Sequence, residues 1–151
     1  MGESVVLHVG QSASVQKTVT AADIDAFAAA TGDFNPIHLD DAYAAGTRFG
    51  RRIAHGMLAA SYVSSVLGTR LPGQGCVYLS QTLKFTKPVF IGDTLTVSAT
   101  VVGYRPERGL VTLETSVSNQ RGENVLEGQA VCLAGDAATP VSAISPVVAA
   151  S

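Results

Sequence analysis

The pattern of hydrophobic and polar positions changes after the glycine-containing loop at 71–75, and this change separates two kinds of predicted element. Before the loop, residues from Gly56 to about Leu67 include no charged side chain, which predicts a helix buried on all sides and too short to span a bilayer. After the loop, apolar residues partly alternate with polar ones, as they do in half-buried strands. These strands are predicted at 77–85, 94–103, 110–117 and 125–133. A buried helix followed by an antiparallel meander predicts an α+β fold.

Shorter elements are predicted ahead of the buried helix. A strand includes residues 15–19, and the helix after it has Thr20 at its N-cap and Asp23 in the capping-box position. Gly32 lies where a helix-ending glycine belongs. A further short helix is expected near 42–45.

The length of 151 residues suits one domain with a genuine core. We assign that single domain to residues 1–134. The remaining segment, 135–151, is poor in charge and rich in Ala, Ser, Val and Pro, so we expect a poorly ordered extension there.

Composition and charge narrow the function. A net charge of −2, an aromatic fraction of 6% and the absence of tryptophan offer no surface for nucleic acid. A hydrophobic fraction of 46% with 15% charged residues favours a well-buried or oligomeric protein. No secretion signal and no membrane span are predicted, and the isolated thiols Cys76 and Cys132 are expected to be small core residues in a reducing cytoplasm.

Candidate chemistry is concentrated between Gly32 and Asp40. Pro36 disfavours the helical conformation for the residue before it, so this stretch is predicted to turn and extend rather than form a helix. Such a turn can direct the Asp33 carboxylate and the His38 imidazole at one water, as the addition of water to a double bond requires. The same sequence is also compatible with an ordinary loop, in which Asn35 is a turn residue rather than a ligand of the water.

The first turn of the buried helix offers a second candidate group. Its N–H groups have no partner inside the helix, and Gly56 places no side chain between them and a ligand. An oxygen gaining negative charge would be stabilised there. The alternative is that Gly56 only permits close helix packing. Ser61 is expected to bond back to a helix carbonyl, and His55 to satisfy nearby backbone groups rather than to catalyse.

These motifs together resemble a known family. Asp33-x-Asn35-Pro36-x-His38 followed by Ala54-His55-Gly56-Met57 is similar to the MaoC-like hydratases, and more narrowly to the (R)-specific enoyl-CoA hydratases. The resemblance covers about 15–133 and continues through motifs at 71–75, 78–85 and 88–93. It implies a hot-dog fold, in which an antiparallel sheet wraps a long central helix, and a homodimer.

The resemblance also implies an activity: reversible hydration of trans-2-enoyl-CoA to (R)-3-hydroxyacyl-CoA. Asp33 and His38 would be the catalytic pair, and the Gly56 N–H would bind the thioester oxygen. Ser64 corresponds to the family's polar residue on the central helix, and with Asn35 and Met57 it is a candidate substrate contact. Coenzyme A is then part of the substrate, and no metal or other cofactor is expected. Arg52 departs from the proline that close relatives often carry, which leaves the shape of the neighbouring loop open.

In the expected reaction, the Asp33 carboxylate takes a proton from a water that His38 also holds, and the water oxygen attacks C3. C2 is then protonated through His38. Other functions remain open at this point. They are dehydration on an acyl carrier protein, thioester hydrolysis, and binding of acyl-CoA without catalysis. Acyl-chain length cannot be read from these residues.

Overall fold

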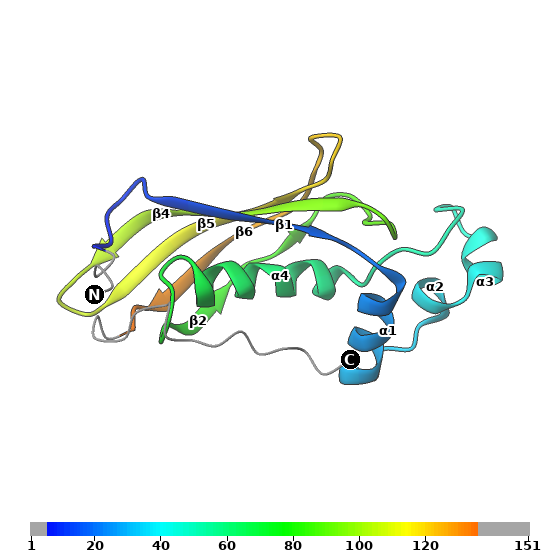
Figure 1. Ribbon diagram of the computed structural model, residues 1–151, viewed down its shortest axis with the longest axis horizontal. Helices are drawn as coiled ribbons and strands as arrows, with labels where there is room; N and C mark the ends of the chain where they lie inside the picture. The colour runs from blue at the N-terminus through cyan, green and yellow to red at the C-terminus, as the bar shows by residue number, and fades with distance from the viewer. Residues whose placement is uncertain (1–5, 136–151) are drawn as a thin grey trace.

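The computed structural model describes residues 6–135, which form a six-stranded antiparallel sheet and four helices (Figure 1). The strand order is β1-β4-β5-β6-β2, and the short β3 also pairs with β6. The strands are β1 (Ser12–Thr18), β2 (Val77–Gln81), β3 (Lys84–Phe85), β4 (Thr94–Arg105), β5 (Leu110–Ser118) and β6 (Asn124–Leu133). Strands β4, β5 and β6 form the antiparallel meander predicted for 94–133. The segment predicted as one strand at 77–85 instead forms β2 and β3, and both pair with β6 rather than with β4, which follows them in the chain. The extension predicted to be poorly ordered lies, apart from Gly135, outside the described residues.

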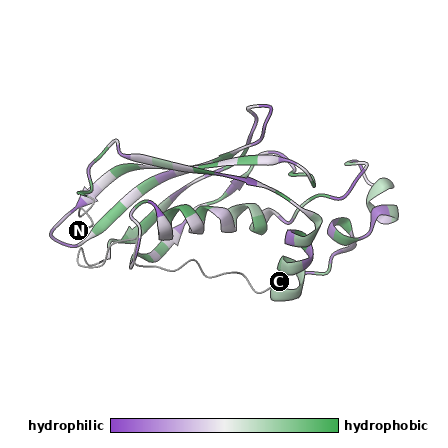
Figure 2. Cartoon of the chain, in the orientation of Figure 1, coloured by the Kyte–Doolittle hydropathy of each residue, from purple (hydrophilic) through white to green (hydrophobic). Residues whose placement is uncertain are grey.

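The core lies between the sheet and the long helix α4 (Gly56–Thr69), which runs along one face of the sheet (Figure 1). Apolar residues alternate with polar ones along the strands, as the colouring in Figure 2 shows. Leu95, Val97 and Val101 of β4 each expose no surface, and Val63 and Val66 of α4 belong to the same cluster. This packing confirms the α+β class, which was predicted from the change in hydrophobic pattern after the loop at 71–75.

The outer side of α4 corrects one expectation. The helix was predicted to be buried on all sides, but Gly56, Met57, Ser61 and Ser64 are exposed. The physical reason is that absence of charge does not require burial, because Gly and Ser lose little by contact with water. The helix therefore covers the sheet with one side and leaves the other side open.

The helices α1 (Ala21–Thr31), α2 (Pro36–Leu39) and α3 (Asp41–Ala45) gather at the end of the molecule where α4 begins (Figure 1). The capping box of α1 is present, since Asp23 N–H donates to Thr20 Oγ1 at 3.1 Å and Thr20 N–H to Asp23 Oδ2 at 3.0 Å. Gly32 ends α1 with a φ of +79°, in the left-handed region. These features and α3 confirm the local predictions.

The helix α2 was not predicted. The stretch around His38 was expected to turn and extend, yet one helical turn begins at Pro36 and contains His38. Proline does keep Asn35 out of the helical region, at φ −54° and ψ 124°, but proline itself fits the first position of a helix. The Asn35 side chain caps the turn by accepting the Ile37 N–H at 3.2 Å.

The cysteines differ from each other in burial. Cys132 is a core residue as predicted, whereas Cys76 is only half-buried, just ahead of β2. Pairing of β2 with β6 brings the thiols near each other, and the neighbouring Cys132 thiol lowers the pKa of Cys76 below its usual value. Cys76 Sγ donates to the Leu67 carbonyl at 3.2 Å. Among residues 6–135, no helix has the length and apolar character needed to cross a membrane.

Candidate active site

Three polar side chains meet where α1, α2 and α4 come together. Asp33 follows the end of α1, His38 lies within α2, and His55 immediately precedes α4. One side-chain oxygen or nitrogen from each lies within 4.8 Å of the others. Asp33 is exposed, whereas His38 is 8% exposed and His55 2% exposed. The structure thus brings together the carboxylate and imidazole that the motif placed five residues apart.

The orientation of His38 is set by the backbone ahead of α4. Its Nδ1 lies 2.8 Å from the carbonyl oxygen of Ile53. A carbonyl only accepts, so Nδ1 carries the proton and Nε2 of the neutral ring has a free lone pair. Burial lowers the pKa of His38 below its usual 6.5, while the hydrogen bond to Ile53 and the charge of Asp33 oppose that shift. The neutral His38 ring can therefore accept a hydrogen bond at Nε2.

The loop that carries Asp33 is held by short-range contacts. Asp33 Oδ1 accepts the Asn35 N–H at 3.2 Å, and the Asp33 N–H donates to Thr31 Oγ1 at 3.2 Å. Together with its capping of α2, this gives Asn35 the turn role that the sequence left open. One carboxylate oxygen of Asp33 thus braces the loop.

His55 contacts both members of the pair. Its Nε2 donates to the Asp33 carbonyl oxygen at 3.0 Å, which confirms that it satisfies a backbone group. Its ring stacks on His38, with centroids 3.9 Å apart and planes 28° apart, and Phe27 lies against it at 4.8 Å. Imidazole lone pairs lie in the ring plane, so two stacked rings do not direct them at one point as a tetrahedral metal site requires.

Gly56 stands exposed at the start of α4, directly after His55, which contacts both members of the pair. Within the described residues, its N–H donates to no protein acceptor. A Cβ built on Gly56 would lie 2.9 Å from Cε1 of Phe85, so a side chain here would press on that ring. Gly56 and Phe85 line a cavity of about 360 Å³ that also includes Arg48 and Lys87.

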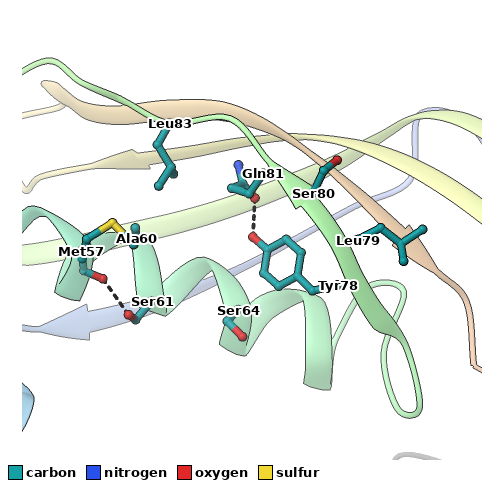
Figure 3. Close-up of a pocket in the computed structure, with 9 residues that line it drawn as sticks. All are labelled: Met57, Ala60, Ser61, Ser64, Tyr78, Leu79, Ser80, Gln81 and Leu83. Carbon is teal, nitrogen blue, oxygen red and sulfur yellow. Dashed lines mark hydrogen bonds between the residues drawn. The ribbon is translucent and has the colours of Figure 1, made fainter. Parts of the chain in front are cut away.

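A second cavity, of about 370 Å³, separates the outer side of α4 from β2 (Figure 3). Ser61 Oγ donates to the Met57 carbonyl at 2.6 Å, as predicted. The candidate contacts Met57 and Ser64 both line this cavity. Its full lining is Met57, Ala60, Ser61, Ser64, Tyr78, Leu79, Ser80, Gln81 and Leu83. The cavity is an apolar groove with serine hydroxyls along one wall.

Sequence reasoning assigned no role to the opposite wall of this groove. Tyr78 directs its ring toward α4 and donates its hydroxyl hydrogen to Gln81 Oε1 (Figure 3). Partial burial of its ring raises the pKa of Tyr78 to about 12. Gln81 also donates to Thr115 Oγ1 at 2.9 Å. These residues belong to the motif at 78–85, which carries the family resemblance but has no pattern of its own that indicates a binding role.

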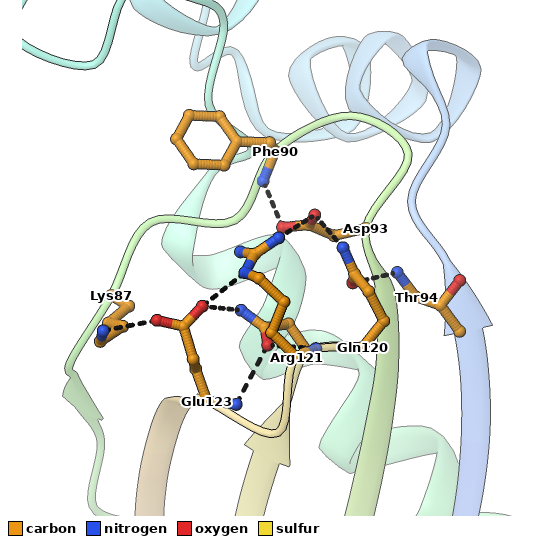
Figure 4. A network of polar contacts seen from close by, with 8 residues as sticks. Lys87, Phe90, Asp93, Thr94, Gln120, Arg121 and Glu123 are labelled. Atoms are coloured by element: carbon orange, nitrogen blue, oxygen red, sulfur yellow. Dashed lines mark hydrogen bonds and ion pairs between the residues drawn. The ribbon is translucent and has the colours of Figure 1, made fainter.

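A polar network outside the groove supports the backbone that leads into α4 (Figure 4). Asp93 is 3% exposed and accepts the Phe90 N–H at 3.0 Å and Gln120 Nε2 at 2.9 Å. Phe90 in turn pairs with Ile53, whose carbonyl binds His38. The turn between β5 and β6 is thereby connected to the candidate site.

The fold and the site define the class of protein. The family model for the MaoC like domain matches residues 7–122, and the chain belongs to this family and has its hot-dog fold. The chain is 50% identical to the (R)-specific enoyl-CoA hydratase of Rhodospirillum rubrum, over 87% of this chain and 94% of that protein. It is 48% identical to the 3-hydroxybutyryl-CoA dehydratase of Methylorubrum extorquens, over 83% and 79%.

A solved structure agrees with these relatives. The (R)-hydratase from A. caviae involved in PHA biosynthesis superposes with a TM-score of 0.82 at 47% identity, covering 85% of this chain and 97% of that one. Fold and family are therefore established over nearly all the described residues.

Proposed function

We propose that this chain is an (R)-specific enoyl-CoA hydratase, which adds water reversibly to trans-2-enoyl-CoA to give (R)-3-hydroxyacyl-CoA. The observation that carries the proposal is the approach of Asp33 and His38 beside Gly56. A relative with this named activity is 50% identical over most of the chain, which supports the same substrate class here. The (R) outcome rests on that likeness, because spacing alone sets no stereocentre.

His38 enters the reaction as a hydrogen-bond acceptor. Because Nδ1 donates to Ile53, the neutral ring presents Nε2 without a proton. A water held between Nε2 and the Asp33 carboxylate gives one hydrogen to each, and its oxygen lone pair is left to attack C3. The pair therefore orients the water as well as activating it.

The proton and electron balance follows from this arrangement. As the C3–O bond forms, one O–H bond of the water breaks and its proton passes to Asp33. The π electrons of the C2–C3 bond move onto the thioester oxygen, which the Gly56 N–H and the start of α4 stabilise. The proton then reaches C2 from Asp33, or from His38 after transfer to Nε2, and the carbonyl reforms. Oxygen and hydrogen arrive from the same side, so the addition is syn.

The acyl chain is assigned to the groove between α4 and β2. Met57 lies next to Gly56 at its start, and Ser64 is two turns further along α4. Asn35 contributes by holding the Asp33 loop, and a contact with the bound water is a second role for it. Coenzyme A belongs to the substrate, and every step above uses groups of this chain and needs no further cofactor or metal.

We also infer a homodimer and a cytoplasmic location. The edge strand β2 exposes Val77, Tyr78 and Leu79, which a second copy would cover. The free thiols Cys76 and Cys132 suit a reducing compartment. Cell fractionation tests the location, and the oligomeric state is tested below.

Three other functions make different predictions. A dehydratase acting on acyl carrier protein would use the same pair but prefer a carrier-protein substrate. A thioesterase would release free thiol from a saturated acyl-CoA. A binding module would hold enoyl-CoA without turnover, but it would need neither Asp33 nor His38.

The first test is the decay of enoyl-thioester absorbance when purified protein meets crotonyl-CoA. The wild type is expected to consume it, and Asp33→Asn to lose about a hundred- to ten-thousand-fold in rate, the usual contribution of a general acid or base. Asp41→Asn is the matched control, since Asp41 is also exposed and lies outside the site. No decay by the wild type at several chain lengths, or full activity in Asp33→Asn, would refute the proposal.

A further inference from the structure

We propose that His55 is a positioning residue that fixes the two catalytic groups relative to each other. It holds the Asp33 loop through a hydrogen bond and His38 through ring stacking. The inference rests on the proposed function, because it takes Asp33 and His38 as the groups that activate water. His55 differs from them because its Nε2 is occupied by the Asp33 carbonyl and its ring contacts both Phe27 and His38.

The position of His55 in the chain does not account for its contacts. It occupies the N-cap of α4, where a side chain usually accepts a helix N–H, yet it makes no such bond. Instead Nε2 reaches a carbonyl 22 residues earlier in the sequence. The side chain therefore serves the loop after α1 rather than its own helix.

The hydrogen bond to Asp33 leaves the other ring nitrogen of His55 buried without a partner among the described residues. Since Nε2 carries the proton donated to Asp33, Nδ1 of the neutral ring must accept, but Nδ1 is buried and has no partner within residues 6–135. A buried polar group left unpaired destabilises the folded chain, because it has lost its hydrogen bond to water. Phenylalanine would fill the same space without this cost, so packing alone gives no reason for histidine here.

The stacking connects His55 to the second group. Its ring contacts Phe27 of α1 and stacks on His38 of α2, with the His38 and His55 ring centroids 3.9 Å apart. The hydrogen bond to Ile53 and the stacked His55 ring together restrain the orientation of the His38 ring. The segment 53–56 thus supplies the Ile53 carbonyl, the His55 ring and the Gly56 N–H. Through these groups it positions the catalytic pair relative to the proposed oxyanion donor.

Two substitutions separate the two contacts. His55→Phe keeps a stacked ring and removes the donor to Asp33, whereas His55→Gln keeps an amide N–H near the position of Nε2 and removes the ring. His55→Phe is expected to lower kcat on crotonyl-CoA by up to about a hundred-fold, with KM changed little, because a misplaced catalytic group affects the chemical step. His55→Gln is expected to retain more of kcat at neutral pH.

The pH profile distinguishes positioning from a merely structural role. Water activation needs neutral His38, so the rate falls as pH drops through the pKa of His38, which lies below 6.5. Burial is the largest cause of that low value, and the Ile53 bond and Asp33 oppose it. The stacked His55 ring contributes to this burial because it covers one face of His38. Arg52 also lies against α2 and donates its Nε hydrogen to the His38 carbonyl, while Asp40 caps the other end of the turn and Asp41 begins the neighbouring α3. His55→Gln should move this acid limb to higher pH, and His55→Phe should move it less.

A measurement on the unchanged protein decides the matter if the variants fold poorly. Nitrogen-15 NMR of labelled histidine should show the proton on Nε2 for His55 and on Nδ1 for His38. The opposite tautomer at His55, or wild-type kcat and an unmoved acid limb in both variants, would overturn the inference. An inactive wild type or an active Asp33→Asn would instead refute the proposed function, so the two failures are distinguishable.

Discussion

Gly56 is the residue at which the backbone itself is expected to take part in the reaction. Its N–H has no acceptor among the described residues. A Cβ atom added at Gly56 would lie 2.9 Å from Cε1 of Phe85. Phe85 is 50% exposed and is free to move aside, so an added methyl group should not unfold the chain. Two explanations for the glycine, access to the N–H and contact with Phe85, can therefore be tested separately.

We predict that Gly56→Ala lowers kcat/KM for crotonyl-CoA by about tenfold or more, because a methyl group crowds a donor whose removal costs about a hundred- to a thousand-fold in other enzymes. Phe85→Ala alone and the double variant complete the cycle. If crowding at the N–H is responsible, the double variant stays as slow as Gly56→Ala. Recovery of activity in the double variant would show instead that displacement of Phe85 caused the loss.

At the scale of elements, the turn between β5 and β6 braces the loop that leads into β4. Asp93 is almost fully buried and accepts from Phe90 and Gln120, with Arg121 Nη1 3.9 Å away. The neighbouring Lys87–Glu123 pair is solvent-exposed, although its hydrogen bond contributes most to lowering the pKa of Glu123 to about 2. Asp93 and Glu123 therefore belong to one network but differ in burial, with the Asp93 side chain 4% exposed and that of Glu123 31% exposed (Figure 4).

Removing the buried carboxylate should cost far more stability than breaking the exposed pair. Asp93→Ala leaves the Phe90 N–H and the Gln120 amide without an acceptor, so we expect the free energy of unfolding to fall by about 1–3 kcal/mol. Lys87→Ala is the control and should change it little, because exposed ion pairs are screened by water. Urea denaturation measures both, and equal effects would contradict this account of the network.

At the scale of the whole molecule, the strand β2 forms both an edge of the sheet, unpaired within residues 6–135, and one wall of the groove beside α4. The strand β2 has one neighbour, β6, and its exposed residues continue toward the groove beside α4. Leu79 points away from α4, whereas Tyr78 points toward it (Figure 3). A second copy placed along β2 would cover an apolar edge that is otherwise a site for unspecific pairing.

We expect the wild type to be a dimer by size-exclusion chromatography with light scattering. Leu79→Lys should shift it toward monomer, because a charge on an edge strand opposes pairing with another edge. Val102→Lys is the matched control, since Val102 is similarly exposed, at 42%, but belongs to β4. A monomeric wild type at micromolar concentration, or dissociation in the control alone, would contradict the proposed interface.

Much of the fold followed from local patterns. The capping box at Thr20 and Asp23, the end of α1 at Gly32 and the alternation along the strands all depend on residues a few positions apart, where backbone geometry leaves few choices. The difference at α2 is also local, because proline restricts the residue before it but itself fits the first position of a helix. The MaoC-like motifs predicted family and fold together.

The linear pattern could not reveal the contacts that organise the site. The bond from His55 to the Asp33 carbonyl spans 22 residues, and that from His38 to Ile53 spans 15. The tautomer of His38, the burial of Asp93 and the open side of α4 likewise depend on which elements pack together. Short-range sequence sets conformations because sterics and capping act over a few bonds. Burial and proton positions are set by neighbours that only folding brings within reach.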